Sequence, residues 1–183
     1  MRIISGTHKG RRINAPKNLP VRPTTDMAKE ALFNILRNQV DLHGLRVLEL
    51  FSGSGNMSYE FSSRGAKSVL AVDEHMPCVA FVQKTAEELE FPIEAIKADV
   101  FSFLGQHQGT YDLIFADPPY ALEDEEFAQI IDKVFEKNLL QEETDEEYAG
   151  MLVVEHSKHT DLSKHSRFDN QRRYGGTVFS FFK

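Results

Sequence analysis

The residues best suited to chemistry lie in the segment YDLIFADPPY, which runs from residue 111 to residue 120. Tyr111 and the apolar run Leu113 to Ala116 predict a strand buried on both faces, and the two prolines then end it because proline cannot donate to a sheet ladder. In open α/β sheets, ligands bind at the carboxyl ends of the strands. There, the Asp117 carboxylate and the Pro118 carbonyl can accept both hydrogens of a flat amino group while the Tyr120 ring stacks. This arrangement suits the exocyclic amine of a nucleobase; the plain alternative is a strand-ending turn with an exposed tyrosine.

A second group of candidate residues surrounds the loop Gly53-Ser54-Gly55, which falls between a predicted strand and a predicted helix. Glycines at such a place let the backbone approach a ligand closely. Asp73 ends the next predicted strand, a position from which a carboxylate commonly binds ribose hydroxyls. Glu49 precedes the loop, and Asp99 follows the third strand, where it can accept from an adenine amine. Each acid alone is more commonly a surface carboxylate or a helix cap, but together with the loop they predict a nucleoside cofactor.

Two residues bear on the kind of cofactor. A dinucleotide fingerprint requires Gly or Ala three residues after its second glycine, and this chain has Ser58 there. A carboxylate at Glu49 suits a ligand with an ammonium group better than a pyrophosphate. S-adenosyl-L-methionine carries an ammonium group and a ribose but no phosphate, so it is the predicted cofactor. A nicotinamide-dependent dehydrogenase is disfavoured, also because no His or Lys suited to hydride transfer is evident.

The elements that position these residues alternate along the chain. Strands are predicted at residues 46–50, 68–72, 93–97, 113–116 and 150–155, and helices at 56–63, 77–89 and 127–135, with a first helix that is opened by residues 22–26 and continues to residue 36. This alternation predicts a parallel sheet with helices on both faces, to which a final hairpin within residues 168–183 adds antiparallel pairing. We expect one domain, residues 1–183, with an extension at residues 1–21 before a catalytic core at residues 22–183. Strands at residues 2–5 and 11–15 would make that extension a hairpin.

The composition fits one globular domain, with 183 residues, 41% hydrophobic and 27% charged. No apolar run approaches the roughly 20 residues that cross a bilayer, and the first residues show no secretory signal pattern. Cys78 is the only cysteine, so no internal disulfide can form. These features favour a cytoplasmic protein.

The charge is unevenly distributed. Residues 1–37 contain eight Lys and Arg against Asp26 and Glu30, which gives +6, and the remaining 13 basic and 26 acidic residues give −13, for the total of −7. A basic segment on an acidic body predicts one face that meets a polyanion. A solvated, disordered tail is the alternative, although interleaved apolar residues favour an ordered arm.

These motifs together resemble the class I S-adenosylmethionine-dependent methyltransferases. Phe51-Ser52-Gly53-Ser54-Gly55 is similar to the cofactor loop of the amino-methyltransferases, and Asp117-Pro118-Pro119-Tyr120 is similar to their (Asp/Asn/Ser)-Pro-Pro-(Tyr/Phe) motif. More narrowly, the chain resembles the bacterial RsmD family through Arg22-Pro23-Thr24-Thr25-Asp26, with Glu30, Leu32, Phe33 and Asn34, and through its opening residues. The resemblance covers nearly the whole chain. It departs from the usual pattern at Asp73-Glu74-His75 and in the acidic stretch at residues 141–147, a predicted solvated loop without an assigned role.

The resemblance implies a Rossmann-like fold with a seven-stranded, mostly parallel sheet whose last strand is antiparallel. It implies methylation of the N2 amine of a guanine in small-subunit (16S) ribosomal RNA, within an assembling subunit, by a monomer. The implied catalytic residues are Asp117, Pro118 and Tyr120. The implied cofactor-binding residues are Glu49, Phe51, Gly53, Gly55, Asp73, Asp99 and Asp117. The implied RNA contacts are Arg2, Lys9, Arg11, Arg12 and Arg22.

Two further readings remain open. A DNA adenine-N6 methyltransferase shares the loop and the cofactor but usually carries a target-recognition region for which this chain leaves little room. A catalytically silent RNA-binding module of ribosome assembly need not keep Glu49, Asp73 and Asp117. Other candidate residues are assigned to the framework: the histidines lack metal-ligand spacing, Phe33, Phe51 and Cys78 suit packing, and Glu155 is interpreted as an ordinary capping or surface acid.

Overall fold

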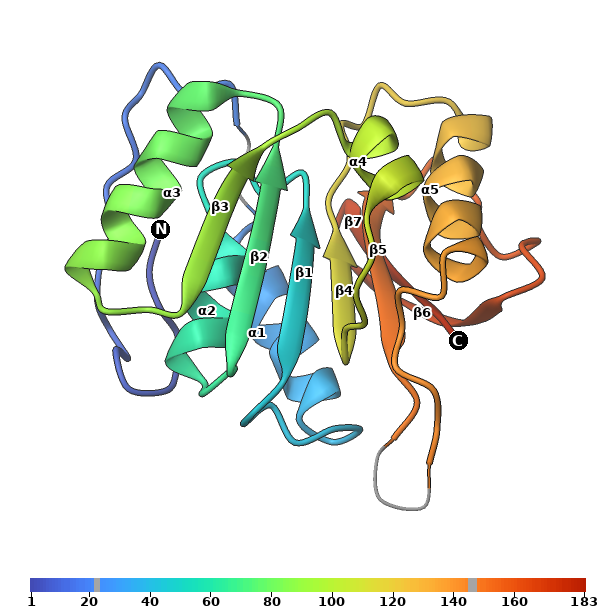
Figure 1. Ribbon diagram of the computed structural model, residues 1–183, viewed down its shortest axis with the longest axis horizontal. Helices are drawn as coiled ribbons and strands as arrows, with labels where there is room; N and C mark the ends of the chain where they lie inside the picture. The colour runs from blue at the N-terminus through green and yellow to red at the C-terminus, as the bar shows by residue number, and fades with distance from the viewer. Residues whose placement is uncertain (22–23, 145–147) are drawn as a thin grey trace.

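The structure is a computed structural model that describes residues 1–21, 24–144 and 148–183. Its centre is a seven-stranded sheet in the order β3-β2-β1-β4-β5-β7-β6 (Figure 1). The strands are β1 (Arg46–Leu50), β2 (Ser68–Asp73), β3 (Ile93–Lys97), β4 (Leu113–Ala116), β5 (Met151–Ser157), β6 (Phe168–Tyr174) and β7 (Thr177–Phe182). The helices are α1 (Asp26–Leu36), α2 (Asn56–Ser63), α3 (Met76–Glu88), α4 (Val100–Gln106) and α5 (Asp124–Glu136).

The pairing follows the prediction. Strands β1 to β5 are parallel to one another, while β7 is antiparallel to both β5 and β6. Four arrowheads, those of β1 to β4, therefore point to the same upper edge in Figure 1. We refer to this edge as the carboxyl edge.

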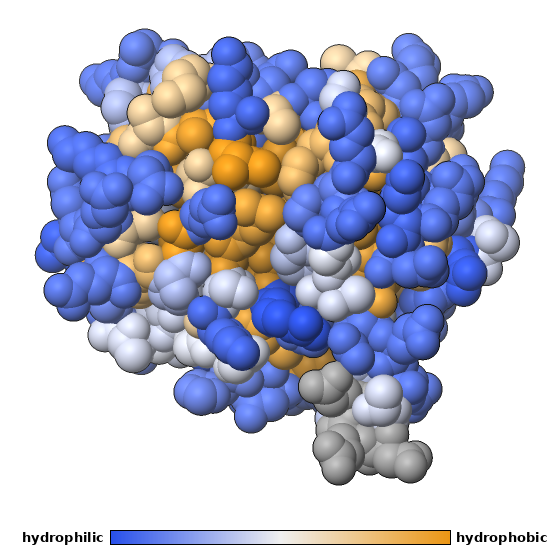
Figure 2. All heavy atoms as spheres, in the orientation of Figure 1, coloured by the Kyte–Doolittle hydropathy of each residue, from blue (hydrophilic) through white to orange (hydrophobic). Residues whose placement is uncertain are grey.

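Two cores cover the two faces of the sheet. One contains apolar residues of α1, α2 and α3, such as Leu32, Phe61 and Val82, and the other contains residues of α4 and α5, such as Leu104 and Ile130. The strands supply both cores because successive side chains point to opposite faces, and every residue of β4 is buried. Figure 2 shows apolar surface over β1, β2 and β3 on the second face, where no helix lies in front of these strands in Figure 1.

Local sequence signals mark the starts of the helices. The Thr25 hydroxyl caps α1 by accepting the Ala28 N–H at 3.2 Å. A reciprocal capping box between Glu123 and Glu126 starts α5. The short helix α4 was not predicted. Asp99 begins it by accepting the Ser102 N–H at 2.8 Å.

The N-terminal arm, residues 1–21, differs from the predicted hairpin. In place of two strands it has a single antiparallel bridge between Arg2 and Arg12, with a turn between them. Backbone hydrogen bonds join the two halves of the arm, such as the Ile3 N–H to the Arg11 carbonyl and the Ile13 N–H to the Met1 carbonyl. The arm also pairs with α2, since the Ile4 and Ser5 N–H groups donate to the Glu60 carboxylate at 2.8 and 3.1 Å. Ile3 and Ile13 enter the first core, so the arm is ordered.

None of the helices in the described ranges is both long and apolar enough to cross a bilayer. The predicted Arg22 contact lies outside the described residues, as do residues 145–147 of the predicted acidic loop.

Candidate active site

A cavity of about 620 Å³ opens at the carboxyl edge of the sheet. It is lined by every predicted catalytic and cofactor-binding residue except Gly55. The parallel pairing explains this convergence. Glu49 is level with Phe115, and Phe115 with Val153, so side-chain alternation places Glu49, Asp117 and Glu155 on the sheet face that α1 and α2 cover.

Gly55 serves the loop through its backbone. Its φ of 81° is left-handed, and a Cβ atom there would lie 2.8 Å from the Tyr59 ring and 2.9 Å from Val82. The glycine is therefore required for conformation and packing at the start of α2. Of the loop's two glycines, only Gly53 lines the cavity.

Asp73 fastens the cofactor loop to the end of β2. Its two carboxylate oxygens accept the Gly53 N–H at 2.8 Å and the His75 N–H at 2.9 Å. The side chain is buried but still lines the cavity. Because each carboxylate oxygen can accept two hydrogen bonds, these contacts leave Asp73 able to accept from a ligand hydroxyl.

Glu49 lies at the base of the cavity and is 2% exposed. Burial raises its pKa to about 8, although a hydrogen bond from the Ser58 hydroxyl favours the ionised form. Ser58, which argued against a dinucleotide, therefore acts as a donor to this carboxylate.

Asp99 is a helix cap that also reaches the cavity. It caps α4 and also lines the cavity as an exposed side chain at the end of β3. Its hydrogen bond to the Ser102 N–H fixes the carboxylate while leaving it reachable.

Asp117 leaves β4 at the opposite side of the cavity. Its backbone N–H donates to the Leu50 carbonyl, whereas no residue in the described ranges donates a hydrogen bond to its carboxylate. Burial raises the pKa of Asp117 well above its usual range, and the nearby Glu155 and Glu49 carboxylates raise it further. Next to it, Pro118 is buried and Tyr120 is 42% exposed, so the tyrosine ring stands at the cavity mouth.

Glu155 corrects the interpretation made from the sequence. It is 3% exposed, lines the cavity, and accepts the Thr24 hydroxyl at 2.7 Å, so it is not a surface acid. The Tyr120 hydroxyl lies 3.5 Å from its other oxygen. The register places it beside Asp117, because Ala116 and Val154 are paired one residue earlier.

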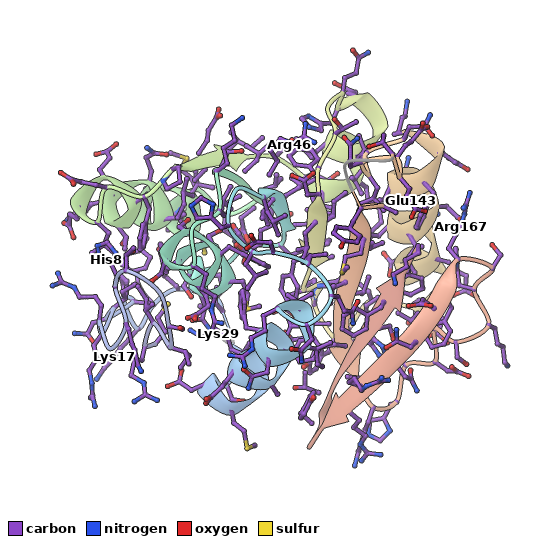
Figure 3. All side chains as sticks on the ribbon, turned by 90° about the horizontal axis from the view of Figure 1, so that it is seen from below. His8, Lys17, Lys29, Arg46, Glu143 and Arg167 are labelled. Atoms are coloured by element: carbon purple, nitrogen blue, oxygen red, sulfur yellow. The ribbon has the colours of Figure 1, made fainter. Side chains whose placement is uncertain are left out.

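Lys29 of α1 is a buried charged residue that the sequence did not single out, and it is 1% exposed. Its ammonium group donates to the Arg2 carbonyl at 2.7 Å and to Asn56 Oδ1 at 2.8 Å, and lies 3.4 Å from Glu60. Figure 3 shows the labelled Lys29 between α1 and α2. Burial lowers the pKa of Lys29, and Glu60 opposes that shift. Asn56 lines the cavity, so this network connects the arm to the site.

The predicted RNA contacts that the structure describes lie away from the cavity. Arg2, Lys9, Arg11 and Arg12 are exposed, and none of them lines it. The turn of the arm contacts Ser63, the last residue of α2, and the His8 ring packs on Phe91, just before β3. The turn therefore lies toward the edge of the sheet opposite the carboxyl edge, and the His8 ring is packed against the body of the protein. Figure 3 shows His8 and Lys17 on the far side from β5, β6 and β7.

The charged side chains that line the cavity suit a cationic nucleoside better than a phosphate. Six carboxylates line the cavity, namely those of Glu49, Asp73, Glu74, Asp99, Asp117 and Glu155. No lysine or arginine of the described ranges joins them. Pyrophosphate would meet uncompensated negative charge there, whereas an ammonium or sulfonium group would be stabilised.

Comparison with known proteins agrees with this chemistry. A family model described as conserved hypothetical protein 95 matches residues 1–183. The putative rRNA methyltransferase YlbH of Bacillus subtilis is 32% identical over 167 residues, which cover 88% of this chain and 85% of that protein. Ribosomal RNA small subunit methyltransferase D of Haemophilus influenzae is 33% identical over 125 residues. That alignment covers 66% of this chain and 64% of the relative, slightly under two thirds.

Solved structures share the fold over the whole chain. A putative methyltransferase yhhF from Escherichia coli has a TM-score of 0.82 at 23% identity, covering 100% of this chain and 96% of the other. The putative methylase HI0767 from Haemophilus influenzae has a TM-score of 0.76 at 26% identity, covering 99% and 96%. The predicted class I methyltransferase fold is thereby confirmed. Since the family model spans the complete sequence, the chain belongs to the conserved hypothetical protein 95 family, the RsmD-like methyltransferases that its sequence resembles.

Proposed function

We propose that this protein uses S-adenosylmethionine to methylate the N2 amine of a guanine in small-subunit ribosomal RNA. The observation that carries the proposal is the Asp117 carboxylate, which faces the cavity beside the Pro118 carbonyl without a hydrogen-bond donor from the described residues. Two acceptors side by side match an amino group with two hydrogens. The curated relatives named as rRNA methyltransferases support RNA as the substrate.

The cofactor would lie over β1, β2 and β3. Glu49 and the Gly53 loop suit its amino-acid end, Asp73 its ribose hydroxyls and Asp99 its adenine amine. When bound, S-adenosylmethionine supplies an electrophilic methyl group on a sulfonium. The Asp73 contacts hold the loop in the shape that receives it, so little ordering remains to be done on binding.

On the substrate side, Asp117 and Pro118 hold the amine by accepting its two N–H groups. The lone pair of a guanine amine is delocalised into the ring, and fixing both hydrogens favours a pyramidal nitrogen whose lone pair is available. Positioning of this kind supplies up to about 7–11 kcal/mol of a barrier. Stacking of the base on Tyr120 contributes about 1–3 kcal/mol.

The methylated nitrogen is acidic and must lose a proton. The raised pKa of Asp117, caused by burial and by its carboxylate neighbours, makes it a better proton acceptor than an ordinary aspartate at this stage. No strong base is needed earlier, because the amine loses its proton only after it has been methylated.

The proposal predicts transfer of tritiated methyl groups to ribosomal RNA or assembling subunits, with N2-methylguanosine as the labelled nucleoside. Asp117→Ala should lower kcat by about 10²–10³-fold, the effect of removing one preorganised hydrogen-bonding group. Asp117→Asn should retain more activity because its amide oxygen still accepts one N–H. Calorimetry should show unchanged cofactor affinity for both variants.

Asp41→Ala, an exposed aspartate outside the cavity, is the matched control and should behave as the wild type. Label in N6-methyladenosine of DNA would contradict the proposal in favour of a DNA enzyme. Cofactor binding lost in parallel with turnover would give Asp117 a structural role instead.

A further inference from the structure

Three basic residues surround the turn between β6 and β7, outside the site described above. The turn, Gly175-Gly176, follows the end of β6 and precedes Thr177, the first residue of β7. Because β5 is parallel to β4 and Thr177 pairs with Ser157 at the end of β5, the turn lies at the carboxyl edge of the sheet. The basic residues around it are Lys158, Arg172 and Arg173.

The pairing of the strands places these residues beside the cavity. Thr177 lines the cavity, and the Lys158 N–H donates to a carbonyl of the turn at 3.1 Å. Arg172 pairs with Phe179, which pairs with Glu155, so side-chain alternation puts Arg172 on the same sheet face as the cavity carboxylates. Neighbouring strands are about 4.8 Å apart, so the backbone of Arg172 is roughly 10 Å from that of Glu155.

The three residues present positive charge to the solvent. All of them are exposed, and within the described ranges no carboxylate forms a salt bridge with any of them. The guanidinium groups of Arg172 and Arg173 donate to backbone carbonyls, those of Gln171 and Gly175, at 2.8 and 3.0 Å. A neutral carbonyl does not cancel the charge of a guanidinium group, and one such bond leaves most of its five N–H donors available.

The cavity itself offers nothing that attracts a phosphate. Six carboxylates line it, and no lysine or arginine of the described ranges does, so an RNA backbone that approaches its mouth is repelled. A base that leaves its stack to enter the cavity brings the phosphates on either side of it to that mouth. The turn of the N-terminal arm lies toward the opposite edge of the sheet, whereas the turn between β6 and β7 lies beside the mouth.

Resting on the proposed function for its substrate, we propose that Lys158, Arg172 and Arg173 form a hairpin surface that binds the RNA phosphates next to the target base. Such contacts position the RNA and carry no base specificity of their own. They are made equally before and during methyl transfer, so they lower the KM for RNA without raising kcat.

The test replaces all three residues of the hairpin surface with serine and measures binding of small-subunit ribosomal RNA over a range of salt concentrations. Each contact with a single strand contributes about 0.7, so the slope of log K against log salt concentration should fall by about 2. With affinities that converge near 1 M salt, this slope corresponds to binding on the order of 100-fold weaker at about 0.1 M. In methyl-transfer assays the KM for RNA should rise while kcat stays the same, and calorimetry should show unchanged cofactor affinity.

Two further variants isolate the charge and the place. Arg172→Lys combined with Arg173→Lys keeps both charges and should keep the wild-type slope. Serine at Lys67, Lys84 and Lys137 removes three exposed cations that do not line the cavity, and this matched control should also keep the wild-type slope.

The outcomes separate the two proposals. A wild type that forms no N2-methylguanosine overturns the proposed function, whereas the binding slopes, which need no methyl transfer, still test the hairpin surface. A wild-type slope in the triple serine variant overturns the hairpin surface even when methylation is intact. An equal fall of the slope in the matched control overturns it too, because the attraction would then come from positive charge anywhere on the protein. A lysine variant that binds as weakly as the serine variant overturns the role of charge.

Discussion

At the ends of β1, β2 and β3, three cavity carboxylates receive hydrogen bonds from the chain itself: Glu49 from Ser58, Asp73 from Gly53 and His75, and Asp99 from Ser102. Across the cavity, the Asp117 carboxylate receives none from the described residues. The Glu155 carboxylate beside it accepts the Thr24 hydroxyl and lies 3.5 Å from the Tyr120 hydroxyl. We call these two regions the cofactor side and the substrate side.

The difference shows where the protein keeps its binding capacity. On the cofactor side the carboxylates also organise the loop and helix starts, so their removal should affect folding. On the substrate side, the proposed function assigns the donors for the Asp117 carboxylate to the amino group of the base. A polar group without a partner costs stability in the free protein, and functional sites commonly accept that cost.

The largest effect within this comparison should come from Glu49 and should depend on pH. In the folded state the pKa of Glu49 is about 8, above the ordinary value of 4.5. Between pH 4.5 and pH 8 the folded protein therefore keeps a proton on Glu49 that the unfolded chain has lost. This contribution to stability is complete below pH 4.5 and is lost as pH rises through 8. At 1.36 kcal/mol per pH unit, the loss is at most about 5 kcal/mol.

Glu49→Gln should remove this pH dependence while keeping an oxygen that accepts from Ser58. Free energies of unfolding in urea, measured without ligand at about pH 5 and about pH 8, would therefore diverge between the two proteins as pH rises. If the unfolding free energies of the two proteins changed with pH in parallel, Glu49 would be ionised in the folded protein at neutral pH, as an ordinary glutamate is.

An intermediate effect should separate Asp73 from Asp117. Asp73→Ala leaves the Gly53 and His75 N–H groups without their acceptor and should cost about 1–3 kcal/mol of stability. Asp117→Ala removes a crowded carboxylate that has no donor among the described residues, so stability should stay the same or rise. Urea unfolding of both variants near pH 7 measures the difference. An equal loss in both would remove the distinction between the two sides.

The cofactor side could be predicted from the sequence because its residues follow local signals. Strand ends, a glycine loop and an acid at the end of the next strand are visible in short segments, and β1, α2 and β3 have the predicted bounds. The position of Glu155 in the cavity depends on the pairing of β4 with β5, two strands separated in the chain by α5. No local pattern encodes that register.

The burial of Lys29 escaped prediction for a related reason. A lysine on a helix is normally solvated, and it is buried here because Glu60, Asn56 and the Arg2 carbonyl come from other segments to meet it. The helix α4 was missed because it has only seven residues and contains a glycine.

The smallest effect should come from the N-terminal arm, whose exposed cations lie outside both sides of the cavity. If Lys9, Arg11 and Arg12 contact RNA phosphates, replacing all three with serine should reduce the slope of log K against log salt concentration by about 2, since each contact with a single strand contributes about 0.7. The unfolding free energy should change little because these side chains are exposed.

The matched variant replaces Lys158, Arg172 and Arg173, which are exposed near the end of β5 and on β6, close in register to the cavity residue Thr177. Salt titrations of RNA binding by both triple variants would locate the contact surface. A slope that changes only in the second variant would assign the phosphate contacts to the β6–β7 hairpin and leave the arm with its packing role against α2.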